Sequence, residues 1–182
     1  MRLFTAIELP EGIKERILEK GEELNAPGIT RVNKNAMHLT LHFFGEKSED
    51  EKEKIISSLM GVKWNPFEVE VYGIAAFNPK FIRVIFAGIR NGSVELASLY
   101  KELSSKLEES SVSFEKEEYK PHITIARVKY GDKGRLLSFI EKYKDYNFGS
   151  FKASSFCLIK STLTPNGPLY EKLFEFKSQG TF

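Results

Sequence analysis

The chain has 182 residues, of which 41% are hydrophobic and 29% charged, and its formal net charge is only +2. This composition is ordinary for a soluble globular protein, and the small net charge argues against a broad polybasic coat for nucleic acid while allowing a local basic cleft. The single cysteine, Cys157, excludes an intrachain disulfide and a cysteine-rich metal site and suits a reducing compartment.

The predicted elements of the first half begin with a strand at Arg2–Leu9. Its apolar run is interrupted by Glu8 and is too short for a signal-peptide core or a membrane span, so we expect a cytoplasmic protein with no membrane segment. A helical pattern begins at Pro10 and is broken by residues 25–28. A second strand is predicted at Ala36–Phe44, and Ser48 then reads as a helix N-cap because acidic residues follow it.

The second half continues the alternation of strands and helices. Strands are predicted at Phe67–Ala76, Phe81–Ala87, Pro121–Val128, Phe148–Lys160 and Leu169–Phe176, and helices at Ser93–Glu109 and Gly134–Tyr143. Residues 78–80 and 164–168 read as the turns of two hairpins. The order predicts an α+β fold with mostly short connections. No linker is visible, so we expect one domain over residues 1–182, built as two lobes that share a cleft.

The most informative feature is the phrase His-x-Thr-x, in which x is aliphatic, because it begins at both His38 and His122 although the chain has only three histidines. In a strand, residues i and i+2 point to the same face. Thr40 therefore lies beside His38, and Thr124 beside His122. Each of the two strands follows a helix and precedes another, so the two halves resemble diverged copies of one unit. We expect the two histidine surfaces to face each other.

Two facing histidines suit acid–base chemistry on a phosphate. Near neutral pH one imidazole can accept a proton while the other donates one. Displacement at phosphorus is in line, so base and acid must lie on opposite sides of the phosphate. The two threonines can donate to the non-bridging oxygens, and Arg127, five residues after His122, is a suitable charged partner. Nothing in this scheme requires a metal or another cofactor, and we expect none.

Other interpretations of these residues fit the sequence less well. A lone strand histidine is more often structural than catalytic, but the duplication argues against this for the pair. The spacing of His38 and His42 matches a zinc-binding helix, yet Leu39 replaces the required glutamate and the alternation favours a strand, so we reject a zinc site. His42 shares a face with His38 in an ideal strand and is expected to be a neighbour or a structural residue. One of Phe43 and Phe44 should pack in the core, whereas the other could stack on a nucleobase.

Three sequence blocks resemble a known family. Residues 2–10 (RLFTAIELP), 38–45 (HLTLHFFG) and 121–127 (PHITIAR) are similar to the two-histidine (2H) phosphoesterases, and more narrowly to the RNA 2′,3′-cyclic phosphodiesterases, which were also named 2′-5′ RNA ligases. The resemblance implies two lobes, each with an antiparallel sheet and outer helices, around a central cleft. It also implies metal-independent hydrolysis of a terminal 2′,3′-cyclic phosphate, on RNA ends or nucleotides, to a 2′-phosphate.

The resemblance further implies a role for each site residue. His38 would be the proton donor to the leaving 3′-oxygen and His122 the proton acceptor that activates water, although the pseudo-symmetry makes these roles interchangeable on physical grounds. Thr40 and Thr124 would hold the phosphate.

Two further positions match the family pattern as substrate-binding residues. Arg127 would support the phosphate, and Phe43 would stack on the terminal base. His42 departs from the pattern, which commonly has an apolar residue there, and this leaves open which phenylalanine faces the cleft. Two alternative functions stay open: joining of cyclic-phosphate and 5′-hydroxyl RNA ends into a 2′-5′ linkage, and binding of RNA or nucleotides without catalysis. No association surface stands out, so we expect a monomer.

Overall fold

The computed structural model describes residues 1–180. The strands are β1 (Arg2–Glu8), β2 (Ile29–Arg31), β3 (His38–Glu46), β4 (Phe67–Ala76), β5 (Val84–Ile89), β6 (His122–Val128), β7 (Asn147–Ala153), β8 (Ser155–Thr164) and β9 (Gly167–Lys177). The helices are α1 (Glu11–Gly21), α2 (Glu49–Met60), α3 (Ser93–Glu109) and α4 (Lys133–Tyr143), with short 3-10 turns η1 (Glu22–Leu24) and η2 (Lys34–Ala36).

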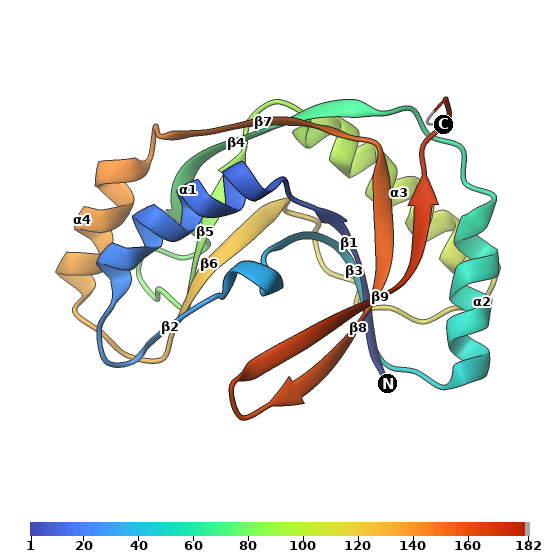
Figure 1. The fold of residues 1–182 in the computed structure, drawn as a ribbon, viewed down its shortest axis with the longest axis horizontal. Coiled ribbons are helices and arrows are strands. Elements are labelled where there is room, and N and C mark those ends of the chain that lie inside the picture. The colour runs from blue at the N-terminus through green and yellow to red at the C-terminus, as the bar shows by residue number, and fades with distance from the viewer. Residues whose placement is uncertain (181–182) are drawn as a thin grey trace.

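The strands form two sheets, which confirms the predicted α+β architecture (Figure 1). One has four strands in the order β3-β1-β8-β9 and the other five in the order β2-β6-β5-β4-β7. Neighbouring strands are antiparallel throughout. The two strands that carry the repeated phrase, β3 and β6, therefore belong to different sheets, as expected. The four-stranded sheet combines both ends of the chain, so the two lobes are not simply its N-terminal and C-terminal halves.

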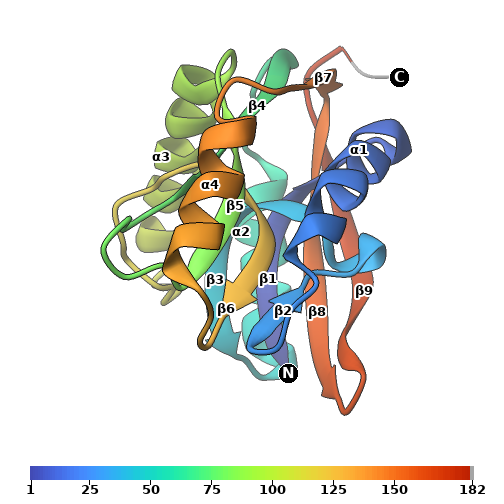
Figure 2. The same ribbon diagram turned by 90° about the vertical axis from the view of Figure 1, so that its left-hand side faces the viewer.

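The helices lie toward the outside and cross between the lobes (Figures 1 and 2). Helix α1 follows a strand of the four-stranded sheet but packs against β6 and β7, and α4 packs against β4 of the same five-stranded sheet. Helix α3 follows β5 but packs against α2 and, through Tyr100 and Ser104, against His42 of β3. Each lobe therefore buries apolar surface that the other lobe supplies, which ties the two sheets together.

Local sequence signals account for the clearest helices. Ser48 caps α2 in a capping box: its hydroxyl accepts from the backbone N–H of Glu51, and the Glu51 carboxylate accepts from the backbone N–H of Ser48. Helix α3 has the bounds that its leucine spacing predicts, and those leucines are buried. Within residues 1–180, no helix is long and apolar enough to cross a membrane.

The prediction of a single strand at Phe148–Lys160 was wrong. Ser154 separates β7, which pairs with β4, from β8, which pairs with β1 and β9 in the other sheet. The burial pattern explains the division. Buried and more exposed residues are interspersed along β7, whereas residues 156–159 of β8 are buried without interruption because β8 is an inner strand. A continuous β-forming stretch does not indicate the residue at which a chain changes sheets.

The remaining differences are small. Strand β2 was not predicted, because three residues are too few to establish a period. The strand predicted from Ala36 begins at His38, since the Asn33 side chain accepts from the backbone N–H of Ala36 and starts the η2 turn. The strand predicted from Phe81 begins at Val84, and the last hairpin turns more tightly, because Thr164 pairs with Gly167.

Candidate active site

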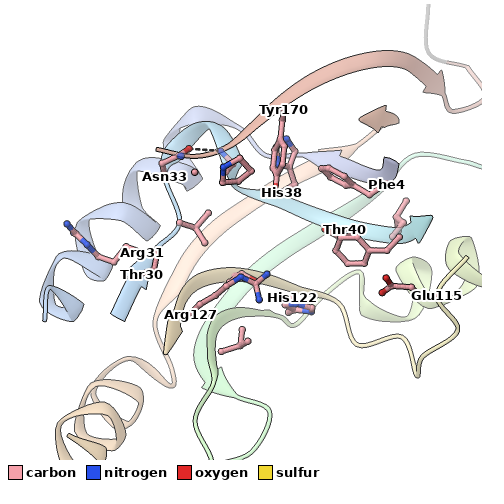
Figure 3. A pocket seen from close by; sticks show the side chains of 18 of the residues that line it. Phe4, Thr30, Arg31, Asn33, His38, Thr40, Glu115, His122, Arg127 and Tyr170 are labelled. Atoms are coloured by element: carbon pink, nitrogen blue, oxygen red, sulfur yellow. Dashed lines mark hydrogen bonds between the residues drawn. The ribbon is translucent and has the colours of Figure 1, made fainter. Parts of the chain in front are cut away.

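A cavity of about 1130 Å³ is lined by residues of both sheets. Strand β3 supplies one wall and β6 another, and Figure 3 shows the imidazoles of His38 and His122 directed into this space from the two strands. The residues that the sequence predicts for the site all line it: His38, Thr40, Phe43, His122, Thr124 and Arg127. The cavity is much larger than a phosphate group, so it has room for a nucleotide beside the reacting centre.

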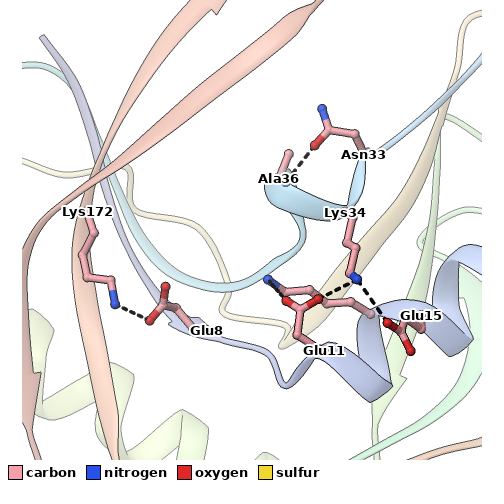
Figure 4. Close-up of polar contacts among 8 residues, drawn as sticks. Glu8, Glu11, Glu15, Asn33, Lys34, Ala36 and Lys172 are labelled. Carbon is pink, nitrogen blue, oxygen red and sulfur yellow. Dashed lines mark hydrogen bonds and ion pairs between the residues drawn. The ribbon is translucent and has the colours of Figure 1, made fainter.

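The segment just before His38 is anchored to α1. The Lys34 ammonium pairs with the carboxylates of Glu11 (2.6 Å) and Glu15 (3.2 Å), both on α1 (Figure 4). These pairs are partly exposed and contribute little energy individually, but they fix the η2 turn from which β3 starts. His38 follows this turn as the first residue of the strand. The His38 ring therefore has a defined position at the start of β3.

The imidazole of His38 lies among aromatic rings. The ring centroid of Phe4 on β1 is 6.0 Å away, and that of Tyr170 on β9 is 5.2 Å away. Burial lowers the pKa of His38, and the nearby backbone of Ala36 offsets part of this effect. Even so, Nδ1 of His38 has no partner that meets hydrogen-bond geometry within residues 1–180.

The imidazole of His122 has matching ring neighbours and a stronger anchor. The centroids of Phe77 and Phe86 lie 4.8 Å and 5.4 Å away. Nδ1 of His122 is 2.7 Å from the backbone carbonyl oxygen of Lys120. A carbonyl can only accept, so Nδ1 carries a proton and the neutral ring has a free lone pair on Nε2. Burial lowers the pKa of His122, the Lys120 carbonyl offsets part of this, and the charge of Arg127 lowers it further.

The alternation of β3 changes after Thr40 because of a β-bulge. Thr40 pairs with Ala6, whereas His42 pairs with Thr5, so Leu41 has no residue opposite it on β1. The hydroxyl of Thr5 accepts a hydrogen bond from the backbone N–H of His42 at the irregular position. His42 and Phe44, which ideal alternation would turn toward the cleft, are therefore buried instead.

Strand β6 has the same irregularity. Thr124 pairs with Phe86, and Ala126 pairs with the preceding residue, Ile85, so Ile125 is the extra residue. In both copies of the phrase, the fourth residue after the histidine is consequently buried and the fifth is exposed. Phe43 and Arg127 are these fifth residues, so one aromatic ring and one guanidinium occupy equivalent places in the two lobes.

The bulge also determines the place of His42. Its side chain is only 1% exposed, whereas Phe43 is 46% exposed. An ideal strand would place His42 on the same face as His38, and that prediction was wrong. The ring of His42 stacks on Tyr100 with centroids 4.3 Å apart, and its Nε2 is 2.8 Å from the Ser104 hydroxyl. Burial lowers its pKa to about 3. The sequence allowed His42 to be either a neighbour of the site or a structural residue, and its burial makes it a structural residue.

Phe43, and not Phe44, is the phenylalanine that faces the cavity. Phe43 lines the cavity with its ring half exposed, 5.9 Å from the ring of Phe4, whereas Phe44 is buried. The ring of Phe43 is therefore accessible to a ligand, and that of Phe44 packs in the core.

The hydroxyl and guanidinium groups that could bind an anion in the cavity have no competing side-chain partners within residues 1–180. Thr40 and Thr124 are partly buried at the cavity wall, and within residues 1–180 neither hydroxyl makes a hydrogen bond. The side chain of Arg127 is exposed, and its guanidinium likewise makes no ion pair or hydrogen bond in that range. In Figure 3 its guanidinium lies close to His122. Two hydroxyl donors and one unpaired guanidinium thus border the space between the imidazoles.

The charges around the cavity are unevenly distributed. Arg31 and Arg127 lie on one side of His122, and Glu115 lies on the other (Figure 3). Glu117, Glu118 and Lys120 also line the cavity, and Lys120 forms an ion pair with Glu118. The acidic residues of the loop before β6 therefore border the site, and their carboxylates oppose binding of an anionic chain at that side.

Sequence reasoning missed several aromatic residues of the site. Phe4, Phe77 and Tyr170 border the histidines. They come from strands and loops distant in the chain, and no spacing links them to the repeated phrase. The high aromatic content was the only available signal for these three. Tyr119, by contrast, directly precedes the second phrase in the sequence, and it lines the cavity, donates a hydrogen bond of 3.3 Å to the backbone carbonyl of Thr40 and stacks on Tyr100 with centroids 4.4 Å apart.

Comparisons with known proteins identify the relatives of this chain. The AKAP7 2′5′ RNA ligase-like domain model matches residues 8–177. The RNA 2′,3′-cyclic phosphodiesterase of Methanocaldococcus jannaschii is 44% identical over 179 residues, which cover 97% of this chain and 100% of the relative. That of Thermotoga maritima is 38% identical over 188 residues and covers 99% of this chain and 97% of the relative.

Solved structures share the fold. The protein TT0787 of Thermus thermophilus superposes with a TM-score of 0.82 at 28% identity, with 100% of both chains covered. Escherichia coli LigT, solved in complex with 3′-AMP, gives a TM-score of 0.82 over 98% of both chains, and at 23% identity this likeness shows the fold alone. By the family match and the full-length relatives, the chain belongs to the family of the 2′5′ RNA ligase-like domain and the RNA 2′,3′-cyclic phosphodiesterases.

Proposed function

We propose that this protein is an RNA 2′,3′-cyclic phosphodiesterase, which hydrolyses a terminal 2′,3′-cyclic phosphate to a 2′-phosphate. The relatives named for this reaction align over nearly the whole chain. The observation that carries the proposal is the cavity with one imidazole from each sheet, each followed by a threonine with a free hydroxyl. This arrangement suits in-line displacement, in which acid and base act on opposite sides of phosphorus.

In this mechanism His122 is the base. The Lys120 carbonyl holds the proton on Nδ1, so the Nε2 lone pair is available to take a proton from water as water attacks phosphorus. His38 in its charged form is the acid: it gives a proton to the 3′-oxygen as the bond between phosphorus and that oxygen breaks. The phosphate remains on the 2′-oxygen. Water thus supplies one proton to His122 and one hydroxyl to the product.

The other site residues stabilise charge and position the nucleotide. The hydroxyls of Thr40 and Thr124 donate to the non-bridging oxygens, and the guanidinium of Arg127 adds a positive charge where negative charge builds up in the transition state. Phe43 offers an exposed ring in the cavity, on the same strand as His38, and the terminal base stacks on it. Neither a metal nor another cofactor takes part in these steps.

We also propose how the substrate enters. The protein grips an RNA end or a nucleotide, and the RNA chain leaves the cleft on the side of Arg31 and Arg127, because the glutamates repel phosphates on the other side. The net charge of +2 suits binding of an end better than coating of a duplex. Residues 1–182 form one domain, which acts as a monomer in the cytoplasm.

The test is a turnover assay with a short oligonucleotide that ends in a 2′,3′-cyclic phosphate. We expect a 2′-phosphate as the product, at the same rate with and without a chelator. A 3′-phosphate product, or loss of activity in the chelator, would refute the mechanism. Tight binding of the oligonucleotide without any turnover would favour the non-catalytic binding module instead.

A further inference from the structure

The loop between α3 and β6 lies along the open edge of β3. That strand is at the edge of its sheet, so the backbone groups on its open side find no partner strand within residues 1–180. The loop supplies donors instead. The backbone N–H of Glu115 donates to the carbonyl of Phe43 at 2.8 Å, and the hydroxyl of Tyr119 donates to the carbonyl of Thr40 at 3.3 Å. The loop therefore holds β3 at two points, one on each side of the bulge.

The ring of Tyr119 is held in place by its neighbours. It stacks on the ring of Tyr100 with centroids 4.4 Å apart and an interplanar angle of 4°, and Tyr100 stacks in turn on the buried ring of His42. Burial raises the pKa of the Tyr119 hydroxyl, so this group stays protonated near neutral pH and can donate. Three stacked rings thus direct one hydroxyl donor at β3.

The residue that follows Tyr119 contacts the opposite wall of the cavity. The carbonyl of Lys120 holds the proton on Nδ1 of His122. Two consecutive residues therefore contact both copies of the phrase, one through its side chain and the other through its backbone. Thr40 and His122 belong to different sheets and line the same cavity (Figure 3). Their separation depends on such connections between the lobes, and a shift of about 1 Å between reacting groups is enough to slow a reaction strongly.

We propose that Tyr119 is a positioning residue that fixes Thr40 relative to His122, an inference that rests on the proposed cyclic phosphodiesterase activity. The tyrosine acts on the reaction through the carbonyl of Thr40. When its hydroxyl is absent, this part of β3 keeps only the link from Glu115 to the loop. The hydroxyl of Thr40 then meets the non-bridging oxygen in poorer geometry, and the loss is greatest in the transition state, where the negative charge is greatest.

The experiment is a double-mutant cycle with cytidine 2′,3′-cyclic phosphate as the substrate. Tyr119→Phe keeps the ring on Tyr100 and removes only the hydroxyl. It is measured alone, together with Thr40→Ala, and together with Thr124→Ala, the equivalent change on the other strand. The control is Tyr100→Phe, which removes a hydroxyl from the adjacent ring of the same stack. For each variant kcat and KM are determined separately, and denaturant unfolding measures stability.

We expect Tyr119→Phe to lower kcat about tenfold and to change KM less than about twofold. Combined with Thr40→Ala, the same change should cost less than about twofold, because the group that the tyrosine positions is gone. Combined with Thr124→Ala, it should again cost about tenfold. Tyr100→Phe should retain the wild-type kcat.

Four results would overturn the inference. The first is a cost of Tyr119→Phe that is equal in the two threonine backgrounds, as a general loss of structure would give. The others are a wild-type kcat in Tyr119→Phe, an equal loss in Tyr100→Phe, and a Tyr119→Phe variant that is unfolded under the assay conditions.

The wild-type rate separates this inference from the proposed function. Turnover by the wild-type protein together with an unaffected Tyr119→Phe variant refutes the positioning role and leaves the phosphodiesterase intact. No consumption of the cyclic phosphate by the wild-type protein refutes the phosphodiesterase itself, and the role of Tyr119 in that reaction with it.

Discussion

Strands β3 and β6 carry the same phrase, the same bulge and a histidine flanked by two aromatic rings, yet their surroundings differ. Nδ1 of His122 lies 2.7 Å from the Lys120 carbonyl oxygen, whereas the Ala36 backbone near His38 raises the pKa of that ring without meeting hydrogen-bond geometry at Nδ1. The exposed fifth residue is Arg127 on β6 but Phe43 on β3. A repeated scaffold thus places two similar imidazoles, and we propose that their unequal neighbours make one the base beside a phosphate-binding arginine and the other the acid beside a base-stacking ring.

The largest effect should come from removing either imidazole. We expect His122→Ala and His38→Ala each to lower kcat for the cyclic phosphate about a thousandfold, within the usual range for loss of a general acid or base. The two differ on a 4-nitrophenyl phosphodiester, whose leaving group needs no proton. On that substrate His38→Ala should retain most of the wild-type rate, and His122→Ala should not. Equal losses for the two variants would contradict the division of roles.

Arg127 should matter next. Arg127→Met removes the guanidinium and is expected to lower kcat/KM about a hundredfold, comparable to loss of one transition-state donor. It should also raise the pKa of His122, since the charge of Arg127 lowers it, and NMR titration of the imidazole measures this shift. The control is Arg83→Met, an exposed arginine that pairs with the Lys129 carbonyl and does not line the cavity. A loss in the control as large as in Arg127→Met would contradict a specific role.

His42 and Ala126, the residues four positions after each histidine, differ in a way that affects stability rather than rate. Burial lowers the pKa of His42 from 6.5 to about 3, so the unfolded state binds the proton first and stability falls as pH falls from the unfolded pKa toward the folded one. Between pH 7 and pH 5 this should cost about 2 kcal/mol.

Denaturant unfolding of His42→Phe tests this, because the variant keeps a ring on Tyr100 and removes the titrating group. Its stability should fall by about 2 kcal/mol less than that of the wild type over the same pH range. Identical pH dependence in the two proteins would mean that His42 does not stay neutral on folding.

The smallest effect concerns the pH optimum. Burial lowers the pKa of both His38 and His122, so the bell-shaped profile of kcat/KM should be centred below 6.5, the pKa of an unperturbed histidine. Initial rates over a pH series with the cyclic phosphate measure it. A maximum on the alkaline side of neutrality would indicate that the two histidines are not the titrating pair.

Much of the site could be predicted from the sequence because it depends on spacing. His38 with Thr40 and His122 with Thr124 follow from the two-residue period of a strand, and the duplication indicates two facing strands. The bulges are not visible in the sequence, since the extra residues, Leu41 and Ile125, are ordinary strand residues. The position of Phe43 in the cleft therefore followed only from resemblance, and the position of His42 was mistaken.

The fold, like the site, could be predicted only where local sequence signals determine it. Helix α3 and the cap of α2 have strong local signals and were correct. The change of sheet at Ser154 and the rings around the histidines depend on tertiary contacts, which no local pattern encodes. The carbonyl of Lys120, which holds the tautomer of His122, is a backbone group that any residue would supply.

The most direct measurement is a crystal structure of the protein with cytidine 2′-phosphate. The account predicts the phosphate between the two imidazoles, with Nε2 of His122 on the side from which water attacks and Nε2 of His38 nearest the ribose 3′-oxygen. The cytosine should stack on Phe43. A phosphate bound away from either histidine, or both imidazoles on the same side of phosphorus, would contradict it.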